Sequence, residues 1–151
     1  MKIDDSAWPL VVATMPTTAG HDTLDVLERY FSACFARGER FVLIVDTRPL
    51  SKIPDALWRK RIVDWMNDPA FKRQNGRLNV GSATIVSSTA VRAALTALGW
   101  LWKAPSPQYY ATGMSDATDW CIGQLRAAGV PITPALEAFH APLSRRVAGM
   151  R

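Results

Sequence analysis

Short apolar runs alternate along this chain with segments whose apolar residues recur at helical spacing. The clearest run, residues 41–45, is apolar at every position, which is typical of a strand covered on both faces in a parallel sheet. Three further runs predict strands at residues 10–13, 83–86 and 109–111, and a weaker signal predicts a partner strand at residues 2–7. Strands that alternate with helices indicate an α/β domain with right-handed crossovers.

Capping residues and helix breakers place the helices among these strands. Asp22 is the expected N-cap of the first helix, which ends before Gly38. Pro54 is expected in the first turn of the second helix, and Pro69 is expected to kink or end it. Ser115 is the expected N-cap of the fourth helix.

Length and composition limit the size of the fold. The 151 residues are close to the usual size of one domain, and 48% of them are hydrophobic, which excludes an ordinary disordered chain. We therefore expect a single small α/β domain at residues 1–130, with a mostly parallel sheet of four to five strands covered by about four helices. Residues 131–151 are expected to form a peripheral C-terminal segment and basic tail.

The sequence also favours a cytoplasmic protein. Two cysteines, Cys34 and Cys121, are too few for a disulfide-stapled scaffold, which favours a reducing compartment. Residues 1–5 include acidic side chains where a signal peptide would be basic and apolar. No apolar run reaches the roughly 18 residues that a membrane-spanning helix needs.

The net charge of +5 is concentrated in two segments. Residues 55–79 carry six basic and three acidic side chains, and the last eleven residues carry three arginines. A solvated helix face and a frayed terminus explain this distribution, and contact with nucleic acid or an acidic membrane is the alternative. The basic clusters lack the interleaved aromatic residues of a stacking platform, so we expect no nucleic-acid partner.

The second half of the chain resembles a known family. Residues 80–88, VGSATIVSS, are followed by a helical segment at 91–100, a proline-rich turn at 105–107 and the segment ATDW at 117–120. This series resembles the bacterial proteins described as SpoIIAA-like or STAS/Sec14-like, over roughly residues 8–128. The resemblance implies a small sheet with helices against it and a regulatory or ligand-binding role rather than catalysis.

Two loops at the carboxyl ends of predicted strands carry the candidate binding residues. In open α/β sheets ligand sites lie at these ends, and the two loops converge if their strands are neighbours. Free N–H groups at a helix start, hydroxyls and guanidinium groups would hold a phosphate or carboxylate. Alternatively, Ser88 caps the following helix and Arg92 pairs with Asp46 as scaffolding. The candidate residues for an anion or ligand are Asp46, Thr47 and Arg48 in the first loop and Ser87, Ser88 and Arg92 in the second.

Ser51 is the candidate for a regulatory phosphate. STAS-type anti-sigma-factor antagonists are switched by phosphorylation of a serine in an Asp-Ser motif in the corresponding stretch, and residues 46–54 contain no Asp-Ser pair. A doubly charged group near a helix N-terminus would gain from the helix dipole. The chemistry therefore allows a switch at Ser51, whereas the motif does not support one.

The sequence contains no arrangement typical of an enzyme. His21, His140, Cys34 and Cys121 are far apart in the sequence and form no cluster with metal-ligand spacing. Both cysteines lie on apolar helix faces, where a buried and unreactive thiol is usual. Nucleophile-elbow, phosphate-loop and dinucleotide motifs are absent from the sequence. We expect no catalytic residues, no metal and no cofactor.

The third predicted helix, residues 90–102, is apolar on almost every side from residue 93 onward. Such a helix is central in the fold or is covered by a partner. Burial in the core, self-association as a homodimer, and contact with a lipid or apolar ligand are the three explanations, and the Sec14 relatives of the family hold lipids. The candidate contact residues are Leu98, Trp100, Leu101 and Trp102.

These features predict a non-enzymatic regulatory or protein-interaction module of the STAS/SpoIIAA-like type in bacterial signalling. Its partner would be another protein, whose identity the sequence does not indicate. The alternative is a small-molecule or lipid carrier with an apolar pocket near the third helix. Contact with a membrane is a lesser expectation.

Overall fold

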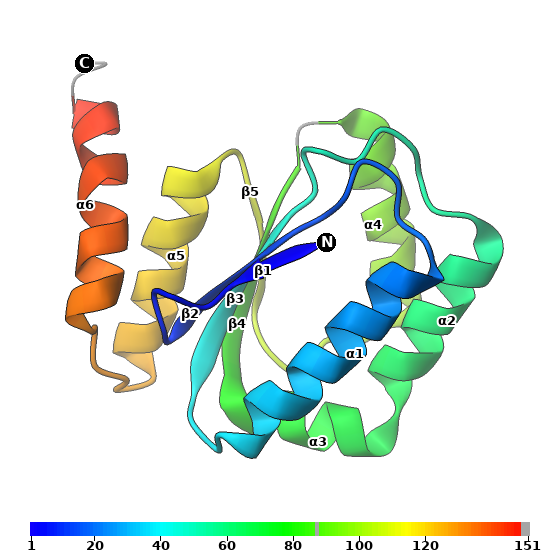
Figure 1. Cartoon of the computed structure of the whole chain (residues 1–151), viewed down its shortest axis with the longest axis horizontal. Coiled ribbons are helices and arrows are strands. Elements are labelled where there is room, and N and C mark those ends of the chain that lie inside the picture. The colour runs from blue at the N-terminus through cyan, green and yellow to red at the C-terminus, as the bar shows by residue number, and fades with distance from the viewer. Residues whose placement is uncertain (87, 149–151) are drawn as a thin grey trace.

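A five-stranded sheet lies between two groups of helices in the computed structural model, which describes residues 1–86 and 88–148 (Figure 1). This arrangement confirms the predicted α/β class. The elements in chain order are β1 (Lys2–Asp4), β2 (Leu10–Thr14), α1 (His21–Ala36), β3 (Phe41–Asp46), α2 (Ala56–Asn67), α3 (Pro69–Leu78), β4 (Asn79–Ile85), α4 (Thr89–Leu101), β5 (Gln108–Ala111), α5 (Met114–Ala127) and α6 (Pro134–Ala148).

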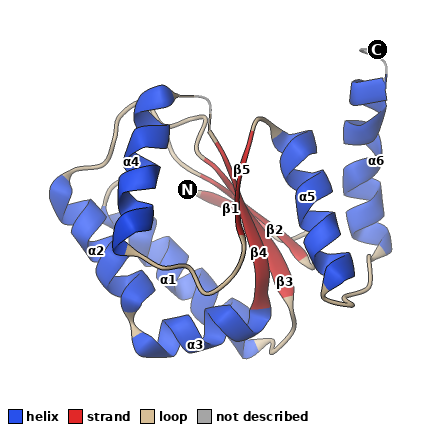
Figure 2. Cartoon of the chain, turned by 180° about the vertical axis from the view of Figure 1, so that it is seen from behind, coloured by secondary structure: helices blue, strands red, loops and turns tan. Residues whose placement is uncertain are grey.

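The strands follow one another across the sheet in chain order, β1-β2-β3-β4-β5. β1 is antiparallel to β2, whereas β2 to β5 are parallel, so the sheet is mixed. Because every parallel crossover moves one strand further in the same direction, right-handed crossovers place all the connecting helices on one face. Accordingly, α1 to α4 cover one face, which we call the four-helix face (Figure 2). α5 and α6, which follow the last strand, cover the opposite, two-helix face.

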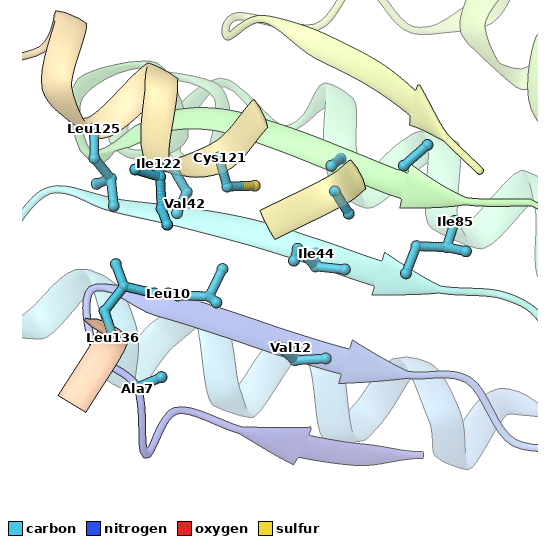
Figure 3. Close-up of a cluster of buried hydrophobic side chains, with 13 residues drawn as sticks. Ala7, Leu10, Val12, Val42, Ile44, Ile85, Cys121, Ile122, Leu125 and Leu136 are labelled. Atoms are coloured by element: carbon cyan, nitrogen blue, oxygen red, sulfur yellow. The ribbon is translucent and has the colours of Figure 1, made fainter. Parts of the chain in front are cut away.

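Alternation of side chains along the strands divides the core into two clusters. In β3, Val42 and Ile44 belong to the cluster on the two-helix face, whereas Phe41 and Leu43 belong to the cluster on the four-helix face. Figure 3 shows the first cluster, which Leu136 of α6 joins beside Leu10 and Ala7. Leu136 is fully buried. The expected peripheral segment therefore includes a helix that contributes to the core.

Within residues 1–130 the described structure contains five helices rather than the expected four or so, and α6 lies in the expected C-terminal segment. The helix that sequence analysis missed, α3, begins at Pro69, which we expected only to kink or end the preceding helix. The Asp68 carboxylate accepts a hydrogen bond from the N–H of Phe71 (2.9 Å) and caps α3. Proline fits the first position of the helix because no intrahelical N–H bond is needed there.

Two predicted helix starts are displaced by one or two residues. Gly20 is the N-cap of α1, and Asp22 lies in the first turn, where its charge complements the helix dipole. α2 begins after Asp55, whose carboxylate accepts a hydrogen bond from the N–H of Trp58 at 2.8 Å. The Asp55 cap places Pro54 before the helix instead of in its first turn.

The N-cap predicted for the fourth helix, now α5, is also wrong. Gly113 occupies the N-cap, and Ser115 lies in the first turn with a hydroxyl that has no hydrogen-bond partner among the described residues. The expected capping of α4 by Ser88 is confirmed, since Ser88 Oγ accepts a hydrogen bond from the N–H of Val91 at 3.4 Å. Gly38 follows α1 with φ of 70°, the left-handed conformation expected of a glycine after a helix.

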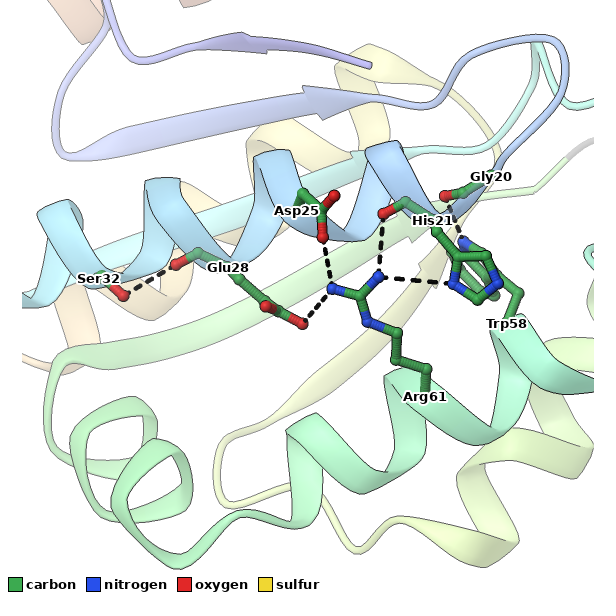
Figure 4. Close-up of polar contacts among 7 residues, drawn as sticks. All are labelled: Gly20, His21, Asp25, Glu28, Ser32, Trp58 and Arg61. Carbon is green, nitrogen blue, oxygen red and sulfur yellow. Dashed lines mark hydrogen bonds and ion pairs between the residues drawn. The ribbon is translucent and has the colours of Figure 1, made fainter.

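A polar cluster on the surface holds α2 against α1 (Figure 4). The Arg61 guanidinium of α2 contacts the carboxylate of Asp25 and lies 3.1 Å from that of Glu28, both on α1. The hydrogen bond from Arg61 lowers the pKa of Asp25. Nearby, the indole N–H of Trp58 donates to the carbonyl of Gly20 at 3.0 Å. These contacts fix α2 as an outer wall of the four-helix face.

Candidate functional site

An apolar cavity of about 400 Å³ lies within the four-helix face, between the sheet and its helices. We call it the interlayer cavity. Side chains of β3, β4, α1, α2 and α4 contribute to its lining, and most of these are apolar. Its volume is within the range of small-molecule pockets, about 300–1,000 Å³. Typical lining residues are Leu27, Leu43, Trp58, Ile62, Leu95 and Leu98.

The cavity exists because small residues face one another across the space between β4 and α4. Ser82 and Thr84 of β4 line it on the sheet side. Ala94 and Gly99 of α4 line it on the helix side, and a Cβ added at Gly99 would meet no other atom within 4 Å. α4 contacts α2, and its one buried residue among those with described burial is Val91. α4 therefore covers the cavity on the side opposite the sheet.

The predicted contact residues of α4 lie in different environments. Leu98 is half-buried and lines the interlayer cavity, whereas Leu101 is 67% exposed and does not line it. Trp102 also lines the cavity, and its indole N–H donates to the carbonyl of Met66 in α2 at 3.1 Å. The side chain of Trp100 lies outside the described part of the structure. The inner face of α4 thus borders a cavity, and Trp102 attaches the end of α4 to α2.

A surface groove between α2 and α4 adjoins the interlayer cavity. Ile53, Arg59, Ala94 and Leu98 line both. Arg59 is the one charged side chain among the described residues of the cavity lining, and its guanidinium donates to the carbonyl of Pro54. Among the described side chains of the lining, charge is therefore confined to the boundary between the cavity and the groove.

A buried polar network lies where α3 meets β4. The side-chain amide nitrogen of Asn79 donates to the amide oxygen of Asn75 at 3.1 Å and to the hydroxyl of Ser82 at 2.9 Å. The backbone N–H of Gly81 donates to the amide oxygen of Asn79 at 3.1 Å. Asn75, Asn79 and Ser82 also line the interlayer cavity, so this network is its polar end.

The two strand-end loops predicted to form a site do meet. β3 and β4 are neighbours, and both the N–H and the hydroxyl of Thr47 donate to the carbonyl of Ile85, at 3.2 and 2.7 Å. The guanidinium of Arg48 forms two hydrogen bonds to the buried carboxylate of Asp46, at 2.9 and 2.7 Å. These hydrogen bonds lower the pKa of Asp46. In this arrangement Thr47 and Arg48 are both engaged within the protein.

Arg92 does not pair with Asp46, so the expected scaffolding contact is replaced by the Arg48 pair. Arg92 instead lies over the ring of Tyr110 in β5, 5.9 Å from its centroid. Ser88 is engaged as the cap of α4. Ser87 lies outside the described residues, so the second loop of the predicted anion site is only partly visible.

Ser51 is exposed but does not lie at a helix start. Its N–H and hydroxyl both donate to the carbonyl of Thr17, at 2.9 and 3.0 Å, which joins the loops after β2 and β3. α2 begins at Ala56 with Asp55 as its cap. A phosphate on Ser51 would therefore lie outside the first turn of α2, where the helix dipole acts.

Both cysteines are buried free thiols, as the sequence predicts. Burial raises the pKa of Cys34 to about 11 and that of Cys121 to about 12. Both thiols are consequently protonated near neutral pH. Within the described ranges, His, Cys, Asp and Glu side chains form no group of three or more that could hold a metal ion. None of the helices described has the length and apolar character to cross a membrane.

Asp119, His140 and Ser144 form a hydrogen-bonded group on the surface of α5 and α6. Nε2 of His140 contacts the Asp119 carboxylate and lies 3.0 Å from the hydroxyl of Ser144. In a nucleophilic triad the serine and the acid contact opposite nitrogens of the imidazole. The Ser144 hydroxyl lies nearer to the nitrogen that contacts Asp119 than to Nδ1 (3.5 Å), and it also donates to the backbone carbonyl of His140 at 3.3 Å. This geometry is that of a surface polar contact.

Sequence reasoning placed the candidate site at the strand ends and missed the polar end of the cavity. The strand-end rule depends on a reversal of strand order that opens a crevice, and this sheet has no such reversal. Asn79, Ser82 and Thr84 were the available signal, because polar residues in a buried strand need a specific purpose. Comparison with family models, curated proteins and solved structures found no match for this chain, so the site is interpreted from its own geometry.

Proposed function

We propose that this protein binds an apolar small molecule, of the size of a short lipid or a fused-ring compound, in the interlayer cavity. The observation that carries the proposal is the apolar cavity of about 400 Å³ beneath α4. An apolar ligand in this cavity would remove apolar side-chain surface from water and would therefore be stabilising. The lining of leucine, isoleucine and aromatic side chains suits an apolar occupant.

The same geometry provides an entry route. α4 contacts α2 and carries small residues on its cavity side, so outward movement of α4 would widen the adjoining groove. Leu95 and Leu98 are half-buried beside the cavity, and a ligand would complete their burial. This agrees with the lipid or ligand explanation for the apolar third helix.

A regulatory role without catalysis, in which a protein partner or a second copy of the chain contacts α4, is the second proposal. The observation that favours it is the outer face of α4, where Leu101 is 67% exposed beside the groove. The STAS/SpoIIAA-like resemblance supports the same role. The two proposals are compatible, because a ligand beneath α4 would change the position of the surface that a partner contacts.

The test is binding of N-phenyl-1-naphthylamine, a neutral dye whose emission rises in apolar surroundings. We expect saturable binding to the wild-type chain. Ala94→Phe, which fills the cavity from α4, should weaken binding at least about tenfold. Thr96→Phe, on the exposed side of the same helix, is the matched control and should change the affinity less than about twofold. Equal binding by both variants, or none by the wild type, would refute the proposal.

A further inference from the structure

The polar end of the interlayer cavity contains three side chains that are almost completely buried. Asn75 and Asn79 are 3% exposed and Ser82 is 7% exposed. Buried polar groups are costly unless each donor and acceptor has a partner. The donors and acceptors that remain unpaired therefore indicate which polar groups a ligand at this end would supply.

The backbone fixes the orientation of both amides. The N–H of Gly81 can only donate, so the atom of Asn79 that it contacts is the amide oxygen. The other end of the Asn79 amide is then the NH₂ group, whose two hydrogens point to Asn75 and Ser82. Asn75 accepts through its oxygen, and Ser82 accepts through its hydroxyl oxygen.

Two donors remain after this assignment. The NH₂ group of Asn75 and the hydroxyl proton of Ser82 have no acceptor among the described residues; the Ser82 oxygen is already an acceptor for Asn79, and the Asn75 nitrogen is not fully enclosed by protein. Both residues contact the same nitrogen of Asn79 and both line the cavity, so the two donors lie close together at one end of it. An acceptor from the ligand would satisfy both.

The acceptor at this end must be uncharged. Arg59 is the one charged side chain among the described lining residues, and it belongs to the boundary with the surface groove. Apart from Arg59, no described side chain of the lining carries a positive charge that would compensate a carboxylate or phosphate beside Asn75 and Ser82 for its loss of water. A carbonyl oxygen needs only neutral donors.

We propose that the ligand carries a carbonyl oxygen, as in a ketone, ester or amide, which accepts hydrogen bonds from Asn75 and Ser82 while its apolar body extends beneath α4. This inference rests on the proposed function and adds the chemical class and orientation of the ligand. It assigns Asn79 a positioning role, since Asn79 holds both donors toward the cavity through a single amide.

The experiment compares three compounds with the same ring system, each as a competitor of N-phenyl-1-naphthylamine at pH 7. They are 2-acetylnaphthalene, which has the carbonyl, 2-ethylnaphthalene, which lacks it, and 2-naphthoate, which is charged. The variants are Ser82→Ala, which removes one donor, and Thr84→Val, which removes another cavity hydroxyl of β4 that the network does not include. The affinity of 2-ethylnaphthalene in each variant shows that the cavity is still formed.

We expect Ser82→Ala to weaken 2-acetylnaphthalene about three- to tenfold, the loss of one hydrogen bond, and to leave 2-ethylnaphthalene within about twofold. Thr84→Val should affect both compounds equally, and 2-naphthoate should bind at least about tenfold more weakly than the ketone in the wild type. Tighter binding of 2-naphthoate, or loss of the ketone's affinity in Thr84→Val alone, would overturn the inference.

The carbonyl assignment and the proposed function can fail separately. If 2-ethylnaphthalene binds and Ser82→Ala changes it and the ketone by the same factor, the carbonyl assignment is wrong and the apolar cavity remains the binding site. If no naphthalene compound and no dye binds to the wild type, the proposed function is wrong and the carbonyl assignment with it.

Discussion

The two faces of the sheet are built from the same strands, but the helices fill the space above only one of them. On the two-helix face, Ile44, Ile85 and Leu125 are fully buried in a continuous cluster (Figure 3). On the four-helix face, Leu95 and Leu98 of α4 remain half-buried beside a cavity. The two-helix face is therefore closely packed under α5, whereas the four-helix face contains a cavity under α4.

Residue size explains the difference. Gly81 of β4 allows α5 to approach so closely that an added Cβ would lie 3.0 Å from the ring of Trp120. Gly99 of α4 has open space around it instead. Along β4 itself, Ser82 and Thr84 face the cavity, and the residues between and beside them belong to the opposite core. A single strand thus separates the closely packed layer under α5 from the layer that contains the cavity.

The largest expected difference between the two faces is in the stability lost on leucine-to-alanine substitution. Leu125→Ala removes a fully buried side chain and should destabilise the protein by about 2–5 kcal/mol. Leu98→Ala only enlarges an existing cavity and should cost about 1 kcal/mol or less in the ligand-free protein. Urea unfolding measures both. Equal losses would show that the four-helix face is as closely packed as the other.

Glycine-to-alanine substitutions on the two faces should change the free energy of unfolding in opposite directions. Gly81→Ala places a Cβ against Trp120 and Gln124 of α5 and should destabilise the protein by about 1–3 kcal/mol. Gly99→Ala lies in a helix with free space around it and should stabilise by about 0.5–1 kcal/mol. Thermal unfolding checks the signs. A destabilising Gly99→Ala would mean that α4 lies closer to the sheet than described.

Much of the fold could be predicted from the sequence because strand and helix signals are local. The apolar run at residues 41–45 corresponds to β3, and the glycine after α1 has the predicted left-handed conformation. Helix starts were less predictable, because several side chains near a start compete for the same N–H groups. Asp55 caps α2 instead of a start at Pro54, and Asp68 with Pro69 begins α3 where we expected only a break.

The candidate site was less accessible to sequence reasoning, because a cavity depends on distances between elements. The sequence shows that α4 is apolar, but it does not show whether the inner face of α4 contacts the sheet, contacts a partner or borders a cavity. Pairing was equally ambiguous: Arg48 and Arg92 were both near Asp46 by topology, and the structure pairs Asp46 with Arg48. Tertiary geometry decides such alternatives, and the local pattern does not contain it.

Thiol reactivity offers a kinetic comparison of the two faces. Cys34 of α1 belongs to the four-helix face and Cys121 of α5 to the two-helix face, and both are buried. Since the layer beside the cavity should open locally at lower cost, Cys34 should react with a disulfide reagent at least about tenfold faster than Cys121. Both rates should rise above pH 8, because the thiolate reacts and burial raises the pKa values to about 11 and about 12.

Peptide mass spectrometry after timed labelling identifies which thiol has reacted. In urea, where both layers are unfolded, the two cysteines should react at similar rates, which is the control for reagent access. Faster labelling of Cys121 in the folded protein would reverse the assignment of the more closely packed face. Protection of Cys34 by N-phenyl-1-naphthylamine, with no change at Cys121, would connect the opening to the cavity.

The smallest expected effect is on the pH dependence of stability, and it concerns the pair of Asp46 and Arg48 at the carboxyl end of β3. Neither residue lines the interlayer cavity. The Arg48 hydrogen bonds hold the pKa of Asp46 below its ordinary value. A folded-state pKa below the unfolded one stabilises the protein at pH values above about 4, and this contribution is lost as the pH falls through the folded-state pKa. Asp46→Asn has no proton to gain, so from pH 7 to pH 3 the wild type should lose about 1 kcal/mol more stability than this variant. Asp64→Asn, at an exposed carboxylate of α2, is the control and should retain the acid sensitivity of the wild type. Urea unfolding at the two pH values measures the difference.

Because the pair is separate from α4, saturation with N-phenyl-1-naphthylamine should leave this difference in acid sensitivity unchanged. A change on dye binding would mean that the carboxyl end of β3 and the cavity are coupled.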